Sequence, residues 1–543
     1  MSGSYGQGKA GFGSVSVWNN PGLSSCRRPL IAGISGGRIL ASMEKQPANP
    51  KDLRKAALIG GVSLTLGLIF NYLFYEKIPG IGFLAYILLV IIGLFIISGA
   101  VKKELSGEAR WLLIPVIFFS AMVFVRASVM LIFLNIIGVI LLLLVIAALS
   151  HSERLGAYLL VDYFKVIFLP IRFIVPLVYT LAAIFTSING NRDQQTILQI
   201  KRGIAITIPF IFIFLVLFSS ADLMFQKYLN QIFDIKPEII LRLFWIIVAT
   251  FAFIGSYSYM FKPEQTIKEK LQTQKAPFKI GHIESSILFG SVNVLFFFFI
   301  LVQFTYLFGG QSNIATQGFT YSEYARRGFG ELVWVAIILL FLLLTTEKYV
   351  RTAESEHTAG FKLLSTALVV QVTLIIASAF MRLLLYEQAY GFTTLRLYSH
   401  CFVIWLALVF LFVLIKIDFD KRENTFAVRV FISMILFLAF MNFLNPDSFI
   451  AKRNIERYNV TGRLDTDYLF SLSDDAIPEL VKVLENADSN ALPPLTKELY
   501  QRYSNRKDYS YYQGWQSMNL SRMQAEKILR VKIEELGPLE SYD

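Results

Sequence analysis

The sequence predicts an all-α, polytopic helical membrane protein, and three observations lead to this fold class. Stretches such as 83–101 and 127–149 are wholly uncharged. Each is close to the roughly 20 apolar residues that a helix needs to cross a bilayer core about 30 Å thick. Hydrophobic residues make up 55% of the chain, and the mean hydropathy is +0.55. Charged residues make up only 17%, whereas soluble chains hold about 25%.

The net charge of +12 comes largely from Lys and Arg in the loops between apolar runs. In a soluble protein this excess would suggest nucleic acid, but in a membrane protein it sets the orientation of the loops. We therefore expect the lipid bilayer as partner and no nucleic acid. Cys26, Cys401 and four scattered histidines show no metal-ligand spacing, which predicts no metal and no cofactor. The histidines are expected in loops.

Eleven apolar runs are predicted to cross the membrane. They are residues 56–75, 81–101, 111–125, 127–149, 203–220, 239–261, 285–308, 331–346, 363–385, 401–416 and 426–443. The third and fourth runs are separated only around Arg126, which requires a tight hairpin. Residues 157–187 are also apolar, but two prolines and three charged residues disfavour a simple span. We interpret this segment as an interfacial or re-entrant element.

The distribution of Lys and Arg predicts the orientation of the spans. With the N-terminus in the cytoplasm and 157–187 not crossing, residues 43–443 place 25 Lys and Arg on the cytoplasmic side and 9 on the other side. Such an excess on the cytoplasmic side is the usual pattern in membrane proteins. A crossing at 157–187 would reverse every later loop and remove the asymmetry. The sequence thus predicts a multi-pass protein of the cell membrane, with a cytoplasmic N-terminus and an extracytoplasmic C-terminal tail.

Three regions follow from these patterns. Residues 1–42 are rich in Gly and Ser and lack any acid, so we expect a disordered leader. Residues 43–443 form the multi-span membrane domain. Residues 444–543 are polar with helical periodicity and are expected to form a small helical tail. In the tail, Asp465 and the run 473–475 are expected to cap helices.

The organised polar residues gather on the predicted outer side, in the loops 309–331 and 386–398 and at the start of the tail, 445–457. Arg binds carboxylate or phosphate through two parallel hydrogen bonds, and Tyr is favoured at membrane interfaces. The candidate ligand or partner site consists of Tyr321, Glu323, Tyr324, Arg326, Arg327, Glu331, Glu387, Tyr390, Thr393, Arg396, Asn454 and Arg457.

Two interpretations of these residues stay open. One is a site for an anionic lipid or a protein partner at the outer face. The other is purely structural, because pairs at helical spacing such as Arg327 and Glu331 often only lock a loop to a helix. We favour the structural interpretation.

Several spaced motifs resemble those of a bacterial membrane-protein family, domain of unknown function 4173, which is kin to domain of unknown function 4153. They are TYxEYARRGFxEL at 320–332, YGxTxLR at 390–396, NPDxxIAxxNxxR at 445–457, GRLDxDYL at 462–469 and LxxDAxPxL at 472–480. The resemblance covers roughly residues 56–540. It implies a polytopic membrane protein and no particular activity, because the family's function is unassigned.

Generic catalytic motifs are missing or misplaced, and no catalytic residue is predicted. Two glycine-rich patterns, at 6–11 and 33–37, lie in the leader without the strand and helix that would give them meaning. Polar residues inside the spans are few, and Asn135, Asn293, Gln303 and Gln371 are expected to hydrogen-bond between helices.

Three functions remain. We favour a non-enzymatic scaffold or sensor with a polar outer face. The first alternative is a transporter or lipid-handling protein that uses the Arg, Tyr and Glu residues at the outer interface. The second is an integral membrane enzyme with Glu323, Glu331 or Glu387 as acid or base.

Overall fold

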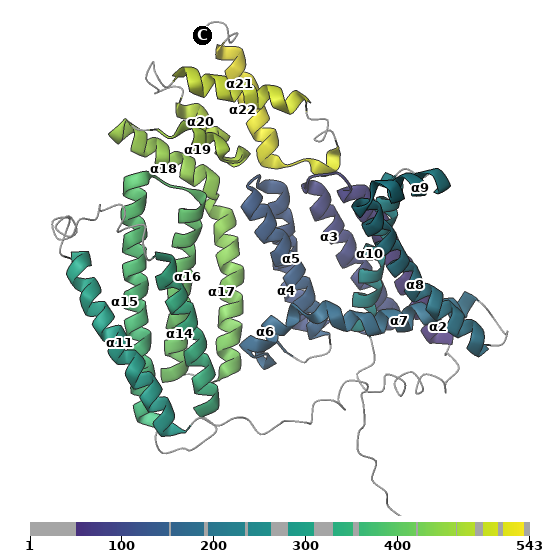
Figure 1. The fold of residues 1–543 in the computed structure, drawn as a ribbon, viewed down its shortest axis with the longest axis horizontal. Helices are drawn as coiled ribbons and strands as arrows, with labels where there is room; N and C mark the ends of the chain where they lie inside the picture. The colour runs from purple at the N-terminus through teal and green to yellow at the C-terminus, as the bar shows by residue number, and fades with distance from the viewer. Residues whose placement is uncertain are drawn as a thin grey trace, which may run out of the picture. The chain divides into compact units, whose positions relative to one another are not determined.

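The structure is a computed structural model. It describes residues 50–150, 154–188, 194–233, 237–261, 281–308, 329–350, 358–419, 422–462, 464–483, 492–508 and 514–536. Every regular element in these ranges is a helix (Figure 1). The predicted all-α, polytopic membrane fold is confirmed.

The membrane domain comprises α2 (Pro50–Phe74), α3 (Ile81–Val101), α4 (Gly107–Val125), α5 (Val129–Leu149), α6 (Leu160–Val166), α7 (Leu169–Ile188), α8 (Gln194–Ala221), α9 (Leu223–Phe233), α10 (Pro237–Met260), α11 (His282–Phe308), α14 (Phe329–Val350), α15 (Thr358–Tyr390), α16 (Thr394–Asp418) and α17 (Glu423–Leu444). The tail comprises α18 (Pro446–Thr461), α19 (Thr466–Ser471), α20 (Ile477–Val483), α21 (Leu492–Asp508) and α22 (Leu520–Leu536).

A helix occupies each of the eleven predicted spans. Among the described residues, nine helices are long and apolar enough to cross a membrane. The other two predicted spans, in α8 and α14, give shorter apolar helices, Ile206–Ala221 and Gly330–Thr346. The predicted hairpin at Arg126 is confirmed, because only residues 126–128 separate α4 from α5.

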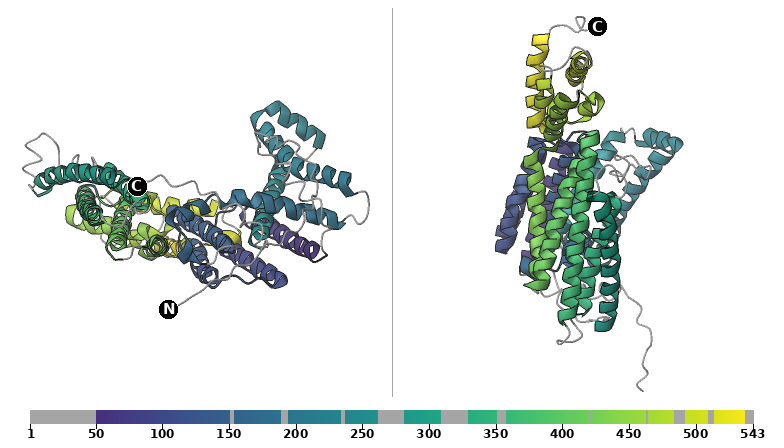
Figure 2. Two further views of the ribbon diagram at one scale, coloured as in Figure 1. Left: turned by 90° about the horizontal axis from the view of Figure 1, so that it is seen from below. Right: turned by 90° about the vertical axis from the view of Figure 1, so that its left-hand side faces the viewer.

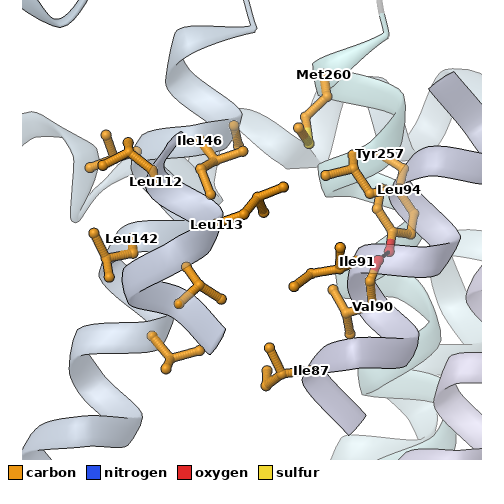
Figure 3. Packing of buried hydrophobic residues seen from close by; sticks show 14 of the residues in the cluster. Ile87, Val90, Ile91, Leu94, Leu112, Leu113, Leu142, Ile146, Tyr257 and Met260 are labelled. Carbon is orange, nitrogen blue, oxygen red and sulfur yellow. Dashed lines mark hydrogen bonds between the residues drawn. The ribbon is translucent and has the colours of Figure 1, made fainter. Parts of the chain in front are cut away.

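The first bundle consists of α2, α3, α4, α5 and α10, and it has one continuous apolar core. Figure 3 shows Val90, Ile91 and Leu94 of α3 facing Leu113 of α4 across this core. Tyr257 of α10 also enters it, and its hydroxyl donates to the carbonyl oxygen of Val90 at 2.8 Å. Burying a tyrosine is favourable here because its polar end finds a backbone acceptor.

Helices α2 and α10 approach each other closely at small residues. A Cβ atom on Gly67 would lie 2.8 Å from the carbonyl oxygen of Ile246 and would also clash with the side chain of Thr250. Ser63, one turn earlier on α2, is fully buried. Small residues at this spacing let two helix backbones come together in a membrane, where packing supplies much of the association energy.

The second bundle consists of α11, α14, α15 and α16, which enclose a separate apolar core together with α17. Helix α17 also contacts α4 and α5, so it joins the two bundles. At this contact the side-chain amides of Asn135 and Asn442 exchange two hydrogen bonds of 2.8 Å. The prediction that Asn135 bonds between helices is confirmed.

The segment predicted as interfacial or re-entrant forms α6 and α7, which are bent by 51° relative to each other. Figure 1 shows α7 running sideways from the lower ends of α4 and α5 toward α10 and α2, which it contacts. Its position in a bilayer stays a prediction.

The tail packs over one end of the spans, as Figures 1 and 2 show. Its core, which includes Ile477, Leu480 and Leu529, is continuous with residues at the ends of the spans such as Leu131 and Met441. The chain turns from α17 into α18 at Asn445, whose φ is +51°, a left-handed conformation that Asn tolerates better than most residues. Asp465 caps α19 as predicted, since its carboxylate accepts from the amide of Tyr468 at 3.1 Å.

We expect Gly67→Leu to lower the free energy of unfolding by about 1–3 kcal/mol, the usual cost of overpacking a tight contact. Thermal unfolding in mild detergent measures this change. Gly61→Leu on the same helix is the matched control, because nothing lies within 4 Å of a Cβ atom there. Equal midpoints for the two variants would contradict the close contact.

Candidate functional site

The predicted site residues fall into three groups. Five of them lie outside the described residues: Tyr321, Glu323, Tyr324, Arg326 and Arg327. Glu331 is exposed in the first turn of α14. The remaining six surround the short connection between α15 and α16: Glu387, Tyr390, Thr393, Arg396, Asn454 and Arg457.

The predicted loop 386–398 is wrong in length. Helix α15 continues to Tyr390 and α16 begins at Thr394, which leaves a connection of residues 391–393. Glu387 and Tyr390 are therefore helical, and so is Arg396. Thr393 starts α16 as its N-cap, with its side-chain oxygen accepting from the amide of Arg396 at 3.4 Å, which satisfies an amide that has no helical partner.

Arg396 is occupied by neighbours on its own side of the connection. Its guanidinium lies over the ring of Tyr386, 4.1 Å from the centroid, and 5.9 Å from the centroid of Tyr390. It also donates to the carbonyl oxygen of Gly391. Stacking on an aromatic face and donating to a carbonyl are both favourable for this cation. In this arrangement Arg396 holds the end of α15 against the start of α16.

Asn454 of α18 fastens the tail to the same connection. Its side chain accepts from the amide of Phe392 and donates to the carbonyl oxygen of Phe392, both at 2.8 Å. Gly391 has a φ of +81°, and a Cβ atom there would lie 2.7 Å from the Asn454 Oδ1 atom and 3.1 Å from the Arg457 Nη1 atom. Only glycine fits this close approach at this backbone conformation without strain.

Glu387 pairs with His400 across α15 and α16. The Nδ1 atom of His400 lies 2.8 Å from the carboxylate, and their side chains are 8% and 2% exposed. The ring also meets Phe380 edge-on, with centroids 4.8 Å apart. The expectation that His400 lies in a loop is wrong. The pair joins two spans near their tail end, where an unpaired buried carboxylate would be unfavourable.

The tail also binds the turn between α4 and α5, through Asp475. One carboxylate oxygen of Asp475 accepts from the amides of Ala127 and Ser128, both at 2.8 Å. The other accepts from the Ser521 hydroxyl. These two amides precede α5 and have no partner within it. The prediction that the run 473–475 caps α20 misses this role, because Asp475 instead reaches a different hairpin.

The carbonyl end of α4 is satisfied by the tail as well. Asn519 donates to the carbonyl oxygens of Val123 at 3.1 Å and Arg126 at 2.7 Å. The Ser521 hydroxyl also lies 2.8 Å from the carbonyl oxygen of Val125, so its single hydrogen is shared between this oxygen and Asp475. The last carbonyls of a helix need such partners when water is excluded, so the tail closes both sides of the turn.

Asp447 of α18 lies beside this contact and is 5% exposed. Its carboxylate accepts from the amide of Ser473 at 3.2 Å. Burial raises the pKa of Asp447 above its ordinary value of 3.8, and the nearby Asp475 raises it further, whereas hydrogen bonds from Ser473 and Ser128 lower it. In the turn itself, burial lowers the pKa of Arg126, and the carboxylate of Asp475 opposes that shift.

A third contact joins the tail to the turn between α2 and α3. The amide of Ile81 donates to the carbonyl oxygen of Met518 at 2.9 Å. The Trp515 indole donates to the Tyr72 hydroxyl at 3.4 Å. Together, the contacts of the tail with residues 72–82, 123–128 and 391–394 form what we call the tail interface.

The sequence patterns anticipated part of this interface. Gly391, Thr393, Asn454 and Asp475 all lie in the spaced sequence motifs at 390–396, 445–457 and 472–480. Asn519 and Ser521 lie outside those motifs, and their position at the start of an amphipathic helix, α22, is the only sequence signal that points to them.

The comparisons with known proteins give one match. Residues 113–483 match the model of the family described as "Domain of unknown function (DUF4153)". The chain belongs to this family. It matches no curated protein, and it matches no solved structure. The matched residues include the α4–α5 turn, the α15–α16 connection, Asn454 and Asp475. The contacts of the tail with 123–128 and with 391–394 therefore lie within the family domain. The exception is their partners in 519–521, which lie beyond its end.

We expect the stability of the tail interface to fall as the pH rises. Because the pKa of Asp447 is raised in the folded protein, the folded state binds a proton more tightly than the unfolded state. The stabilisation is present below the unfolded pKa of about 4 and is lost as the pH rises through the folded value.

Thermal unfolding midpoints across this pH range test the expectation. The Asp447→Asn variant should show a smaller decrease with pH than the wild type, whereas Asp467→Asn, at an exposed position, should follow the wild type. If the unfolding midpoint of Asp447→Asn fell with pH as steeply as that of the wild type, the pH dependence would come from another group.

Proposed function

We propose that this integral membrane protein is a non-enzymatic scaffold or sensor whose tail forms a rigid face over the ends of both bundles. The observation that carries the proposal is the tail interface. Three hairpin turns from both bundles end on one small helical domain, and their backbone groups are satisfied by its side chains and backbone. Such an arrangement fixes the spacing of the turns and presents one surface to a partner.

The engagement of the candidate residues supports a structural role for them. Arg396 is stacked and bonded within its own connection, Asn454 is bonded to Phe392, and Glu387 is paired with His400. A guanidinium that is already stacked and hydrogen-bonded must give up those contacts before it can bind a phosphate or carboxylate.

The alternatives rest in part on residues outside those described. A transporter or lipid-handling function would use Arg326 together with Arg396, and an enzyme would need two carboxylates among Glu323, Glu331 and Glu387 to face one another. Both stay hypotheses. The motif at 320–332 also favours a closer kinship with domain of unknown function 4173, which we retain as a proposal.

Native mass spectrometry with thermal unfolding tests the scaffold against the lipid handler. We expect Arg396→Ala to lower the unfolding midpoint by a few degrees, because a cation–π contact and a hydrogen bond are lost, while the bound mass stays that of the wild type. Arg453→Ala is the control, since its side chain is about half exposed and makes its contacts with Glu456 and with the ring of Phe449, both on its own helix, α18. A discrete ligand lost in Arg396→Ala and kept in Arg453→Ala would favour the lipid handler.

We also propose that the N-terminus is cytoplasmic, that the protein resides in the cell membrane, and that the tail is extracytoplasmic. The support is the excess of Lys and Arg in the loops opposite the tail. Single cysteines in a Cys26→Ser background test this arrangement, because Cys401 is buried.

In spheroplasts, a membrane-impermeant maleimide should label Val460→Cys, whose position on α18 is 87% exposed. Gly156→Cys lies in open space, on the side of α4's start, and should react only after the membrane is permeabilised. The reverse pattern would invert the topology.

A further inference from the structure

Helix α7 packs across the end of the first bundle. The backbones approach closely at Gly255 of α10, where a Cβ atom would lie 3.0 Å from the carbonyl oxygen of Phe173. Farther along α7, Thr180 and Ser258 share a hydrogen bond of 2.7 Å, and Ile184 touches α2 at Gly60. One side of α7 is therefore fixed to two spans.

The register of these contacts gives the direction of α7. Phe173 and Thr180 are seven residues apart, roughly 10 Å along a helix, whereas their partners Gly255 and Ser258 are separated by only roughly 4.5 Å. If α7 lay along α10, its contact residues and their partners would be separated by the same distance along the two helices. Since Ser258 is in the last turn of α10, α7 crosses steeply at the end of that span, as Figure 1 shows.

The opposite face of α6 and α7 is apolar, and no part of the chain that the structure describes covers it. Five large side chains at helical spacing are each more than half exposed: Phe164 at 61%, Phe168 at 66%, Ile171 at 64%, Ile174 at 56% and Val175 at 52%. Leaving such a stripe in water is unfavourable. The spans beneath it are lipid-facing too, since only 22% of the α10 window is buried.

Two cations accompany this stripe. Lys165 is 61% exposed and pairs with Asp162 at the surface, and Arg172 is exposed while it hydrogen-bonds to Tyr259 of α10. Long basic side chains next to an apolar face can place their stems along it and their charges at the level of the lipid phosphates. Basic residues at this depth favour anionic headgroups.

We propose that α6 and α7 form a binding surface for anionic phospholipid within one leaflet of the membrane. The apolar stripe contacts acyl chains, and Lys165 and Arg172 contact headgroup phosphates. Continuity with the lipid-facing sides of α2 and α10 argues for lipid rather than a second copy of the chain. This surface does not involve the tail interface, so it stands or fails independently of the scaffold function.

Depth measurements test the placement of α7. A fluorophore is attached to a single cysteine at one of three positions, in Ile171→Cys, Val175→Cys or Phe185→Cys, each in the full-length Cys26→Ser protein. The labelled protein is placed in nanodiscs whose lipids carry spin-label quenchers at a shallow or a deep position. Similar depths at all three positions are expected. A steady change of roughly 20 Å from 171 to 185, the length of helix between them, would make α7 a crossing span. Quenching at none of the positions would mean that protein covers the stripe. Either result overturns the proposal.

Headgroup preference is tested with nanodiscs of phosphatidylcholine that hold a minor fraction of phosphatidylglycerol. Native mass spectrometry should show phosphatidylglycerol retained by the wild type, and Lys165→Gln/Arg172→Gln should retain it on the order of ten-fold less, as expected for two lost cations near the surface. Lys102→Gln/Arg110→Gln, exposed cations at the same end of the bundle, is the matched control. If both double variants lost phosphatidylglycerol equally, or if neither lost it, the proposed contact of Lys165 and Arg172 with the headgroup would be contradicted.

Discussion

The carboxylate of Asp475 is the contact on which the arrangement of the tail and the spans depends. It accepts from two amides that precede α5 and have no partner within that helix. A buried carboxylate needs donors, and buried amides need an acceptor, so each group stabilises the other. Removing the carboxylate would leave two buried amides unsatisfied, at a cost of about 1–3 kcal/mol each.

The contacts around Asp475 continue into the membrane domain. Arg126, in the same turn, donates to the carbonyl oxygen of Asn442 at 2.9 Å, and Asn442 pairs with Asn135 inside the contact between α17 and α5. The tail, the α4–α5 hairpin and the helix that joins the two bundles thus share one polar network. In a membrane, where apolar packing does not distinguish helix from lipid, such bonds help to specify which helices meet.

The sequence predicted the spans well because an apolar run of the required length has few other uses. It predicted the ends of the spans poorly. The apolar pattern places Tyr386, Arg396 and Tyr398 in a loop, although they belong to α15 and α16. Hydropathy detects only the hydrocarbon core, and Arg and Tyr are tolerated at helix ends near the headgroups. Asp475 was interpreted as a local cap because capping is a short-range signal, whereas its partner Ser128 lies 347 residues away. No local pattern encodes a contact at that separation.

Hydrogen exchange at the amides of Ala127 and Ser128 tests the central claim most directly. In the wild type, these amides should be protected by the carboxylate that binds them. In the Asp475→Ala variant they should exchange at least on the order of ten-fold faster, which corresponds to about 1.4 kcal/mol, and Asp467→Ala should match the wild type. Unchanged protection in Asp475→Ala would show that the tail is held on the spans by something other than this carboxylate.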